Sequence, residues 1–243
     1  MYISVAIRRA SVLGAASAFA LLFSVAASSA ATFSIVGGSG FTLPSSGATY
    51  DPNTSSGPTP TTAQTVADGV GQGTMVTSFG PGITAGQGLF VSPQNVTLSF
   101  EFIGKEAGDL DAALTFLNST LLLNTENPGT IATGSFNVGS APGLVPLKFV
   151  DQSLSEPGTA KNGGPIDTKT AIAFYIVPRT NNSVVYAFFD DGGAGPDKDY
   201  DDMVLRITAT ATPLPAALPL FASGLGALGL LGWRRKRKAS LVA

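Results

Sequence analysis

Short stretches of alternating apolar and polar residues, repeated along the middle of the chain, restrict its fold more than any other feature. In VTLSFEFIG, residues 96–104, Val, Leu and two Phe residues occupy alternate positions, and Thr, Ser and Glu stand between them. A period of two with aromatic and β-branched residues is typical of a strand with one buried face. The pattern predicts a sheet protein, and no heptad or long amphipathic helix competes with it.

Five further stretches have the same character, because each is short, rich in apolar residues and bounded by Gly, Pro, Asn or Asp. Strands of this length, with turns roughly every 8–12 residues, are typical of an antiparallel sandwich. Residues 110–124 (LDAALTFLNSTLLLN) fit either a helix or a pair of strands. We therefore expect one all-β domain over residues 74–212, an antiparallel, jelly-roll-like β-sandwich. The five stretches are GTIATGSFNV, VPLKFVD, TAIAFYIVP, SVVYAFFD and DDMVLRITAT.

The first 31 residues have the three parts of a signal peptide. Arg8 and Arg9 form a positive start, residues 10–27 are apolar, and the small residues at 28–31 suit cleavage by signal peptidase. An N-terminal membrane anchor is the alternative. Residues 32–73 then combine a short strand (TFSIVGGSGFTL) with a loop rich in Gly, Pro, Ser and Thr from Pro44 to Gly73, a composition that buries little surface.

The composition narrows the chemistry that the chain can perform. It contains no Cys and no His, which excludes disulfides, thiol nucleophiles, His bases and nearly all zinc sites. Between Thr32 and Thr212, 7 Lys and Arg stand against 16 Asp and Glu, which leaves a formal charge of −9. Proteins bind nucleic acid through cationic surfaces. We therefore expect neither a nucleic-acid partner nor an enzyme.

The stretch FFDDGGAGPDKDYDDMVLRI, residues 188–207, has the richest chemistry. Six of the 16 acidic residues fall between positions 190 and 202, and three glycines allow the backbone to turn several carboxylates inward. Carboxylates this dense repel one another, and oxygen ligands in a flexible loop suit Ca²⁺, which accepts six to eight. We predict a Ca²⁺ site formed by Asp190, Asp191, Asp197, Asp199, Asp201 and Asp202.

Other interpretations of this loop stay open. Asp197, Asp199 and Asp201 have EF-hand spacing, but Asp202 stands where the invariant Gly belongs and Thr208 where the bidentate Glu belongs, so the loop is not an EF-hand. A solvated acidic turn at a sheet edge is one alternative. Paired carboxylates that hydrolyse a glycosidic bond are another, with partners in the loop or outside it. The acids considered outside the loop are Glu101, Glu106, Asp109 and Asp111.

The C-terminal tail has three parts in a fixed order. Its apolar run of 17 residues, 217–233, is close to the about 20 residues of a membrane-spanning helix. The basic cluster behind it would stay cytoplasmic under the positive-inside rule, which leaves the β domain outside. The motif in front of the run is Pro213, Leu214, Pro215 and Ala216, and the basic cluster is Arg234, Arg235, Lys236, Arg237 and Lys238.

This tail resembles the PEP-CTERM class of bacterial sorting signals in its VPLPA variant, with Thr212 in place of the leading Val. The resemblance implies that an exosortase, an integral-membrane cysteine protease, processes the protein near residues 213–216 and that the product reaches the surface or the polysaccharide matrix. The segments LSFEFIGKEAG, IAFYIV and YAFFDDGGAGPDKDYDDMVLRI are also similar to a β domain of uncharacterised function in many PEP-CTERM proteins. That likeness implies a sandwich and suggests Ca²⁺ binding by the six aspartates.

These expectations describe an exported structural or adhesive protein of the cell surface or of a biofilm matrix. Ca²⁺ would stabilise it, and signal peptidase, an exosortase-type enzyme and exopolysaccharide would be its partners. A Ca²⁺-dependent carbohydrate-binding module is the first alternative function, and a polysaccharide hydrolase is the second. The C-terminal anchor is expected to be temporary, with retention of an uncleaved tail in the membrane as the alternative.

Overall fold

The computed structural model divides into two compact units, which are Ser28–Leu218 and, separately, Met1–Ala27 with Pro219–Ala243. All strands belong to the first unit. In the second unit the described residues are helical and exposed. The structure describes residues 30–43, 65, 67–71, 73–93, 95–105, 110–115, 120–138, 142–152, 158–191, 200–212, 221, 224–226 and 228–229.

The described part of the first unit is built mainly from short strands that pair antiparallel throughout. It also has helical residues at 65, 67 and 68, and a 3-10 turn, η1 (Pro178–Thr180), joins two of the strands. The all-β prediction is therefore confirmed. The strands are β1 (Thr32–Val36), β2 (Ser39–Thr42), β3 (Met75–Phe79), β4 (Gly88–Ser92), β5 (Asn95–Gly104), β6 (Asp111–Leu114), β7 (Thr120–Leu123), β8 (Ile131–Asn137), β9 (Gly143–Leu144), β10 (Lys148–Asp151), β11 (Gly158–Lys161), β12 (Ala171–Ile176), β13 (Val184–Asp190) and β14 (Met203–Ala211).

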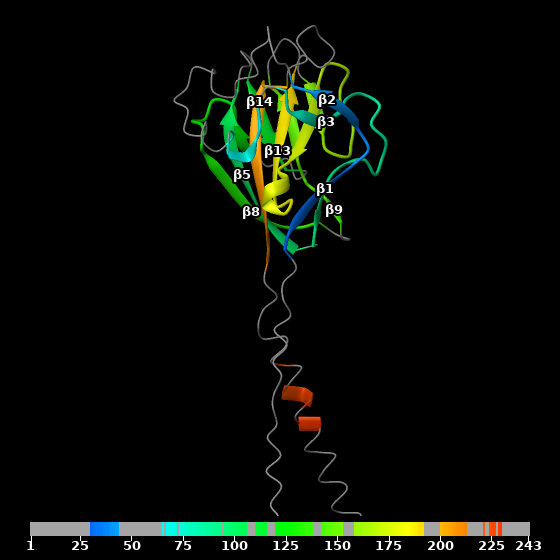
Figure 1. The fold of residues 1–243 in the computed structure, drawn as a ribbon, viewed down its shortest axis with the longest axis vertical. Coiled ribbons are helices and arrows are strands. Elements are labelled where there is room, and N and C mark those ends of the chain that lie inside the picture. The colour runs from blue at the N-terminus through cyan, green and yellow to red at the C-terminus, as the bar shows by residue number, and fades with distance from the viewer. Residues whose placement is uncertain are drawn as a thin grey trace, which may run out of the picture. The chain divides into compact units, whose positions relative to one another are not determined.

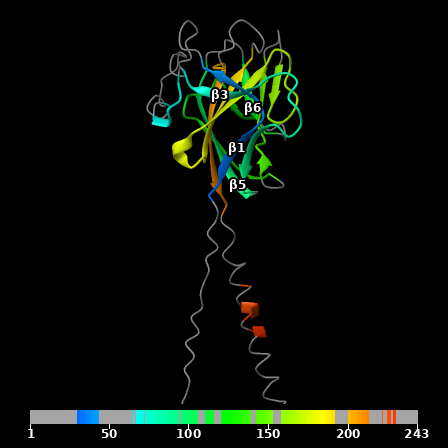
Figure 2. The ribbon, with the colours of Figure 1, turned by 45° about the vertical axis from the view of Figure 1, so that its right-hand side comes forward.

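Three sheets make up the unit (Figures 1 and 2). The largest has seven strands in the order β2-β3-β12-β13-β14-β5-β8, the second has four in the order β11-β10-β6-β7, and the third has three in the order β1-β4-β9. Residues 110–124, which fit either a helix or two strands, form the antiparallel pair β6 and β7. The tertiary partner decides this choice, because β6 also pairs with β10 on its other side.

The alternation in β5 produces the expected buried face. Val96, Leu98 and Phe100 are fully buried, whereas Thr97 and Ser99 between them are half-buried. The buried side chains join a core that includes residues of all three sheets. Its centre contains a stacked aromatic pair, Phe149 of β10 and Phe189 of β13, with ring centroids 5.1 Å apart and an interplanar angle of 5°. The seven- and four-stranded sheets therefore face each other across this core.

A second apolar cluster covers part of the other face of the seven-stranded sheet. It packs Leu43, Val70 and Tyr200 onto β13, which is buried along its whole length. The expectation that residues 44–73 bury little is wrong for the last part of that segment, since Thr65, Asp68 and Val70 are at most 6% exposed. The small and polar residues of this segment did not predict its burial, because most of the apolar surface in the contact belongs to the seven-stranded sheet.

One buried amide links the three- and four-stranded sheets. Asn162, directly after β11, accepts a hydrogen bond from the Leu89 N–H at 2.7 Å and donates to the Leu89 and Val145 carbonyls at 2.8 and 2.9 Å. Its side chain thus adds to the backbone pairing at this point, where the Val145 N–H donates to the Leu89 carbonyl at 3.0 Å. Gly88 is required beside it, because φ is +126° and a Cβ would collide with Asn162 Oδ1.

The chain enters and leaves the sandwich at one end. β1 starts there and β14 ends there (Figure 1), and the Thr212 N–H donates to the Asn95 carbonyl beside it. The predicted membrane helix 217–233 lies largely outside the described residues. Within the described part of the chain, no helix has the length and hydropathy needed to cross a membrane.

Candidate metal centre

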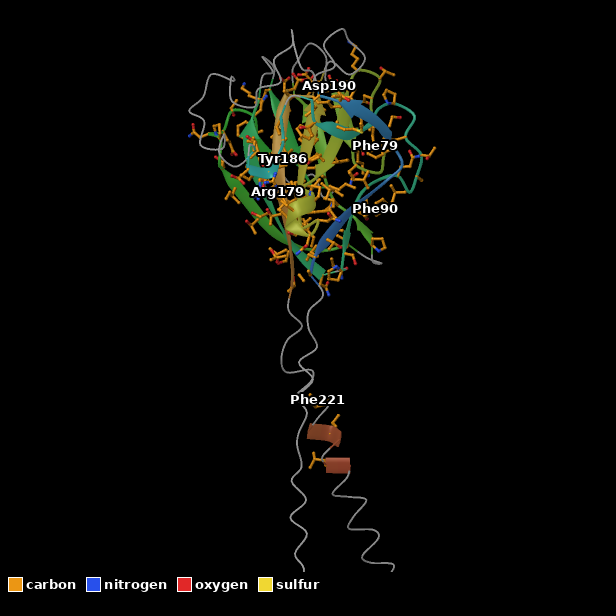
Figure 3. The ribbon with its side chains drawn as sticks, viewed as in Figure 1. Phe79, Phe90, Arg179, Tyr186, Asp190 and Phe221 are labelled. Atoms are coloured by element: carbon orange, nitrogen blue, oxygen red, sulfur yellow. The ribbon has the colours of Figure 1, made fainter. Side chains whose placement is uncertain are left out.

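The predicted acidic loop connects β13 to β14 at the end of the sheet opposite the chain's entry, where Figure 3 labels Asp190. Asp190 is the last residue of β13 and is 2% exposed, and Asp201, shortly before β14, is 3% exposed. Asp191 and Asp202 are half-buried. Asp197 and Asp199 lie outside the described residues. The four described aspartates therefore stand at the two ends of the loop, directed by the ends of two paired strands.

Local contacts hold these two ends together. The Asp191 N–H donates to Asp202 Oδ2 at 2.7 Å, across eleven residues of chain. Tyr200 adopts a left-handed backbone conformation with φ of 66° and is 5% exposed, and its ring lies 5.0 Å from that of Phe41. Because Tyr200 is anchored in the second apolar cluster, Asp201 and Asp202 are brought next to Asp190 and Asp191.

The opposite sheet contributes a further carboxylate, which the sequence analysis did not assign to the Ca²⁺ site. Asp111, the first residue of β6, is fully buried, and its Oδ2 accepts a hydrogen bond from Asn124 Nδ2 at 3.1 Å. Asp151 of β10, 2% exposed, is its partner in the strand register. The available clue was an acid that begins an otherwise apolar strand, LDAAL, but sequence could not show which strand it would face.

We call the end of the sandwich that carries Asp111, Asp190, Asp191, Asp201 and Asp202 the acidic end. Its negative charges affect the pKa of Asp202. Burial, followed by the negative charge of Asp191 and then those of Asp190 and Asp111, raises the pKa of Asp202 to about 9, against the lowering effect of the Asp191 N–H. The neighbouring charges that act on Asp202 are all those of carboxylates. Burying several carboxylates together is costly unless a proton or a cation neutralises them. The acidic end is therefore a place where a bound cation would relieve repulsion.

The donor chemistry fits a hard cation, because carboxylate and amide oxygens are the ligands that Ca²⁺ takes. In the part of the chain that the structure describes, no group of three or more Asp, Glu, His or Cys side chains is arranged to hold a metal ion. A complete centre would therefore need oxygens from residues 192–199, where two of the predicted ligands, Asp197 and Asp199, are found.

The other acids considered in the sequence have different surroundings. Glu101 of β5 lies on the outer face of the seven-stranded sheet, where Arg206 Nη1 is 3.5 Å from its Oε2. Asp111 is buried at the acidic end, and Glu106 and Asp109 lie outside the described residues. Glu101 and Asp111 are thus engaged in separate polar clusters, which gives no support to a hydrolytic pair formed by these two.

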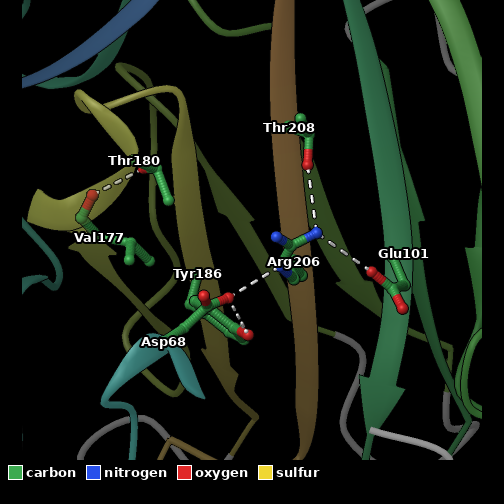
Figure 4. A network of polar contacts seen from close by, with 7 residues as sticks. All are labelled: Asp68, Glu101, Val177, Thr180, Tyr186, Arg206 and Thr208. Carbon is green, nitrogen blue, oxygen red and sulfur yellow. Dashed lines mark hydrogen bonds and ion pairs between the residues drawn. The ribbon is translucent and has the colours of Figure 1, made fainter. Parts of the chain in front are cut away.

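A second polar cluster, shown in Figure 4, joins the segment around Asp68 to the outer face of the sheet. Asp68 Oδ2 accepts hydrogen bonds from the Tyr186 hydroxyl at 2.9 Å and from Arg206 Nε at 3.0 Å. Burial and the nearby Asp68 charge raise the pKa of Tyr186, so this phenol keeps its proton at neutral pH. No sequence pattern links these residues, because Asp68 and Tyr186 are 118 positions apart and meet only through tertiary packing.

The sorting motif, residues 213–216, and the basic cluster, residues 234–238, lie outside the described residues. Comparisons of the chain with protein-family models, with curated protein sequences and with solved structures find no match.

Proposed function

We propose that this chain is an exported structural or adhesive protein of the cell surface or extracellular matrix, whose sandwich is stabilised by Ca²⁺ at its acidic end. The observation that supports the metal part of this proposal is the burial of carboxylates from both main sheets at one end of the sandwich, where Asp111, Asp190 and Asp201 are at most 3% exposed and Asp191 bonds to Asp202. With no Cys in the chain, disulfides cannot stabilise the domain outside the cell. A bound cation would take that role.

The proposed role of Ca²⁺ is to neutralise the carboxylates and to order the connection between β13 and β14. Asp190, Asp191, Asp201 and Asp202 would hold the ion together with Asp197 and Asp199, and Asp111 would join them from the opposite sheet. A ligand that binds only the folded state stabilises it by about 2.7 kcal/mol at a hundredfold excess over Kd. That is a large part of the 5–15 kcal/mol that is typical of a folded domain.

The sorting part of the proposal rests on the signal-peptide pattern and on the PEP-CTERM resemblance of the tail. An exosortase-type enzyme would process the chain near Pro213–Ala216, after the apolar run 217–233 has served as a temporary anchor. The sandwich suits attachment at Thr212, because β14 ends on the side away from Asp190 (Figures 1 and 3). Mass spectrometry of the extracellular product tests this part, and a peptide that extends past Trp233 contradicts it.

A Ca²⁺ titration of the unit Ser28–Leu218 tests the metal part. This unit contains both apolar clusters, whose residues all lie between Ala31 and Ala211, so it has its own core. We expect millimolar Ca²⁺ to raise Tm relative to EDTA and to bind in a calorimetric titration. The combined change Asp190→Asn with Asp202→Asn should abolish both effects.

Asp167→Asn is the matched control, because Asp167 is exposed and is not among the charges that act on Asp202. It should leave Ca²⁺ binding unchanged. An absence of Ca²⁺ binding to the wild-type unit, or full binding by the double variant, would overturn the metal proposal. A glycan array with and without chelator then separates a structural role from the carbohydrate-binding alternative, since a structural role predicts no chelator-sensitive sugar binding.

A further inference from the structure

The outermost strand of the seven-stranded sheet, β8, has the features of an open pairing edge. It is seven residues long, and Ile131, Thr133, Ser135 and Asn137 on its outer face are exposed, with Ile131 at 59%. Its sequence, IATGSFN, contains no charged residue and no Pro. Edge strands are usually protected by such residues or by being short. By contrast, the opposite edge of this sheet, β2, has four residues, and the edge strand β11 contains Lys161.

The hydrogen bonds of β5 show which residues of β8 face outward. The Phe102 N–H donates to the Thr130 carbonyl, while the Phe102 carbonyl accepts from Gly129, so Phe102 bonds on the β8 side. The Asn95 carbonyl accepts from Thr212, on the β14 side. Bonding directions alternate along a strand, so Val96, Leu98 and Phe100 bond to β8. Their register partners Phe136, Gly134 and Ala132 bond back.

The residues between those partners therefore direct their backbone groups away from β5. In β8 these are Ile131, Thr133 and Ser135, by the same alternation. They form a regular row of N–H and C=O groups along this edge of the sheet, with which no other described strand pairs, and Figure 1 shows β8 there. A strand added here would find the same spacing that β5 uses on the other side.

The residues of β5 that pair with β8 indicate which kind of strand could be added at the other edge of β8. Opposite residues 132–136, β5 places Phe100, Ser99, Leu98, Thr97 and Val96. A second copy of β8, antiparallel and centred on Gly134, would place Phe136, Ser135, Gly134, Thr133 and Ala132 opposite the same positions. The two series read Phe-Ser-Leu-Thr-Val and Phe-Ser-Gly-Thr-Ala, so an aromatic, a Ser and a Thr recur in the same places.

The existing cross-strand contacts show why this series is favourable. On the outer face, Thr97 Oγ1 lies 3.3 Å from Ser135 Oγ and Ser99 Oγ lies 3.3 Å from Thr133 Oγ1. Two copies related by a two-fold axis would again place a Thr opposite a Ser, because Thr133 would stand opposite the second copy's Ser135, here in a hydrogen-bonded pair with more widely spaced side chains. Such hydroxyl pairs stabilise a sheet.

We infer that β8 pairs antiparallel with β8 of a second copy of this chain, about a two-fold axis at Gly134, to join two seven-stranded sheets into one. The uncharged strand is suited to this contact, because the chain between Thr32 and Thr212 carries a formal charge of −9 and two acidic surfaces would otherwise repel each other. A two-fold contact of this kind uses the same patch on both copies. The inference does not depend on Ca²⁺ binding or on the sorting signal.

The test is the oligomeric state of the unit Ser28–Leu218 by sedimentation velocity across a range of concentrations. We expect the wild-type mass to double as concentration rises. Thr133→Pro removes an outward N–H but no hydrogen bond to β5, and edge strands accept Pro at such positions. The dimer contact loses this N–H donor from both copies, so the dissociation constant of the dimer should rise by at least about tenfold. Thr133→Ser, which keeps both the N–H and the hydroxyl, is the matched control and should dimerise within about threefold of wild type.

Residue-resolved hydrogen exchange of the wild-type unit provides a test that does not depend on the folding of a variant. The amides of Thr133 and Ser135 should gain protection only at concentrations where the dimer forms, whereas those of Ala132 and Gly134 should be protected throughout. A monomer at all concentrations would overturn the inference. So would a dimer in which the amides of Thr133 and Ser135 exchange as fast as in the monomer, or a folded Thr133→Pro variant that dimerises like wild type.

Discussion

Replacement of Asp68 by Ala is the sharpest test of how the segment around Asp68 is held on the seven-stranded sheet. Asp68 Oδ2 accepts from the Tyr186 hydroxyl and from Arg206 Nε at 2.9 and 3.0 Å. The Asp68 and Arg206 side chains are 6% and 18% exposed, and Tyr186 is fully buried. The substitution would therefore deprive a buried hydroxyl and a largely buried guanidinium of the acceptor that they share.

The expected loss of stability follows from the two donors that lose their acceptor, the Tyr186 hydroxyl and the Arg206 guanidinium. A hydrogen bond to a charged group contributes about 1.5–3 kcal/mol, and a buried donor left without an acceptor costs about 1–3 kcal/mol. Glu101 still lies 3.5 Å from the guanidinium, which favours the lower part of these ranges. We expect Asp68→Ala to lower the free energy of unfolding by about 3 kcal/mol. Tyr186→Phe should cost only about 1 kcal/mol, because Asp68 keeps its bond to Arg206.

Urea unfolding of the unit Ser28–Leu218, followed by far-UV circular dichroism, measures both values. The double variant Asp68→Ala with Tyr186→Phe should cost about 1 kcal/mol less than the sum of the single changes, because the second change removes the donor that the first has left without its acceptor. Strict additivity, or an Asp68→Ala cost no larger than that of Tyr186→Phe, would refute the shared-acceptor explanation.

Two further predictions concern the link between sheets and the acidic end. Asn162→Ala should lower the free energy of unfolding by about 3 kcal/mol in the same urea assay, because the Leu89 and Val145 backbone groups lose three buried hydrogen bonds; a cost below about 1 kcal/mol would contradict the linking role. In EDTA, the free energy of unfolding should fall as the pH rises from 5 to 8. The reason is that Asp202 keeps its proton in the folded state up to about pH 9, whereas an unfolded Asp loses it near pH 3.9. The expected slope is about 1.4 kcal/mol per pH unit for one proton, and either saturating Ca²⁺ or Asp202→Asn should flatten it; a slope that persists in Asp202→Asn would assign it to other groups.

Individual strands could be predicted because their pattern is local. In β5, β13 and β14 the alternation or apolar run lies within about ten residues, and the buried faces of the folded strands agree with it. The ambiguity of residues 110–124 was equally local in origin, since a short apolar run satisfies both periods. It was resolved by β10, which pairs with β6 from a distant part of the chain.

Four of the five aspartates at the acidic end could be predicted in the same way. Asp190, Asp191, Asp201 and Asp202 are close in sequence, and a loop between paired strands necessarily brings its ends together. Asp111 could not be assigned, because its proximity depends on the packing of the four-stranded sheet against the seven-stranded one. The contact between Asp68 and Tyr186, 118 residues apart, was hidden for the same reason.

Periodicity and composition were enough to predict the class of the fold, the absence of disulfides and the concentration of acids in one loop, because these features arise from neighbouring residues. Which strands meet, which carboxylates share the acidic end, and the place of β8 at the edge of the described sheet depend on tertiary packing. A strand's pattern specifies which face is apolar. It does not specify which distant strand, segment or second molecule will cover that face or pair with its edge.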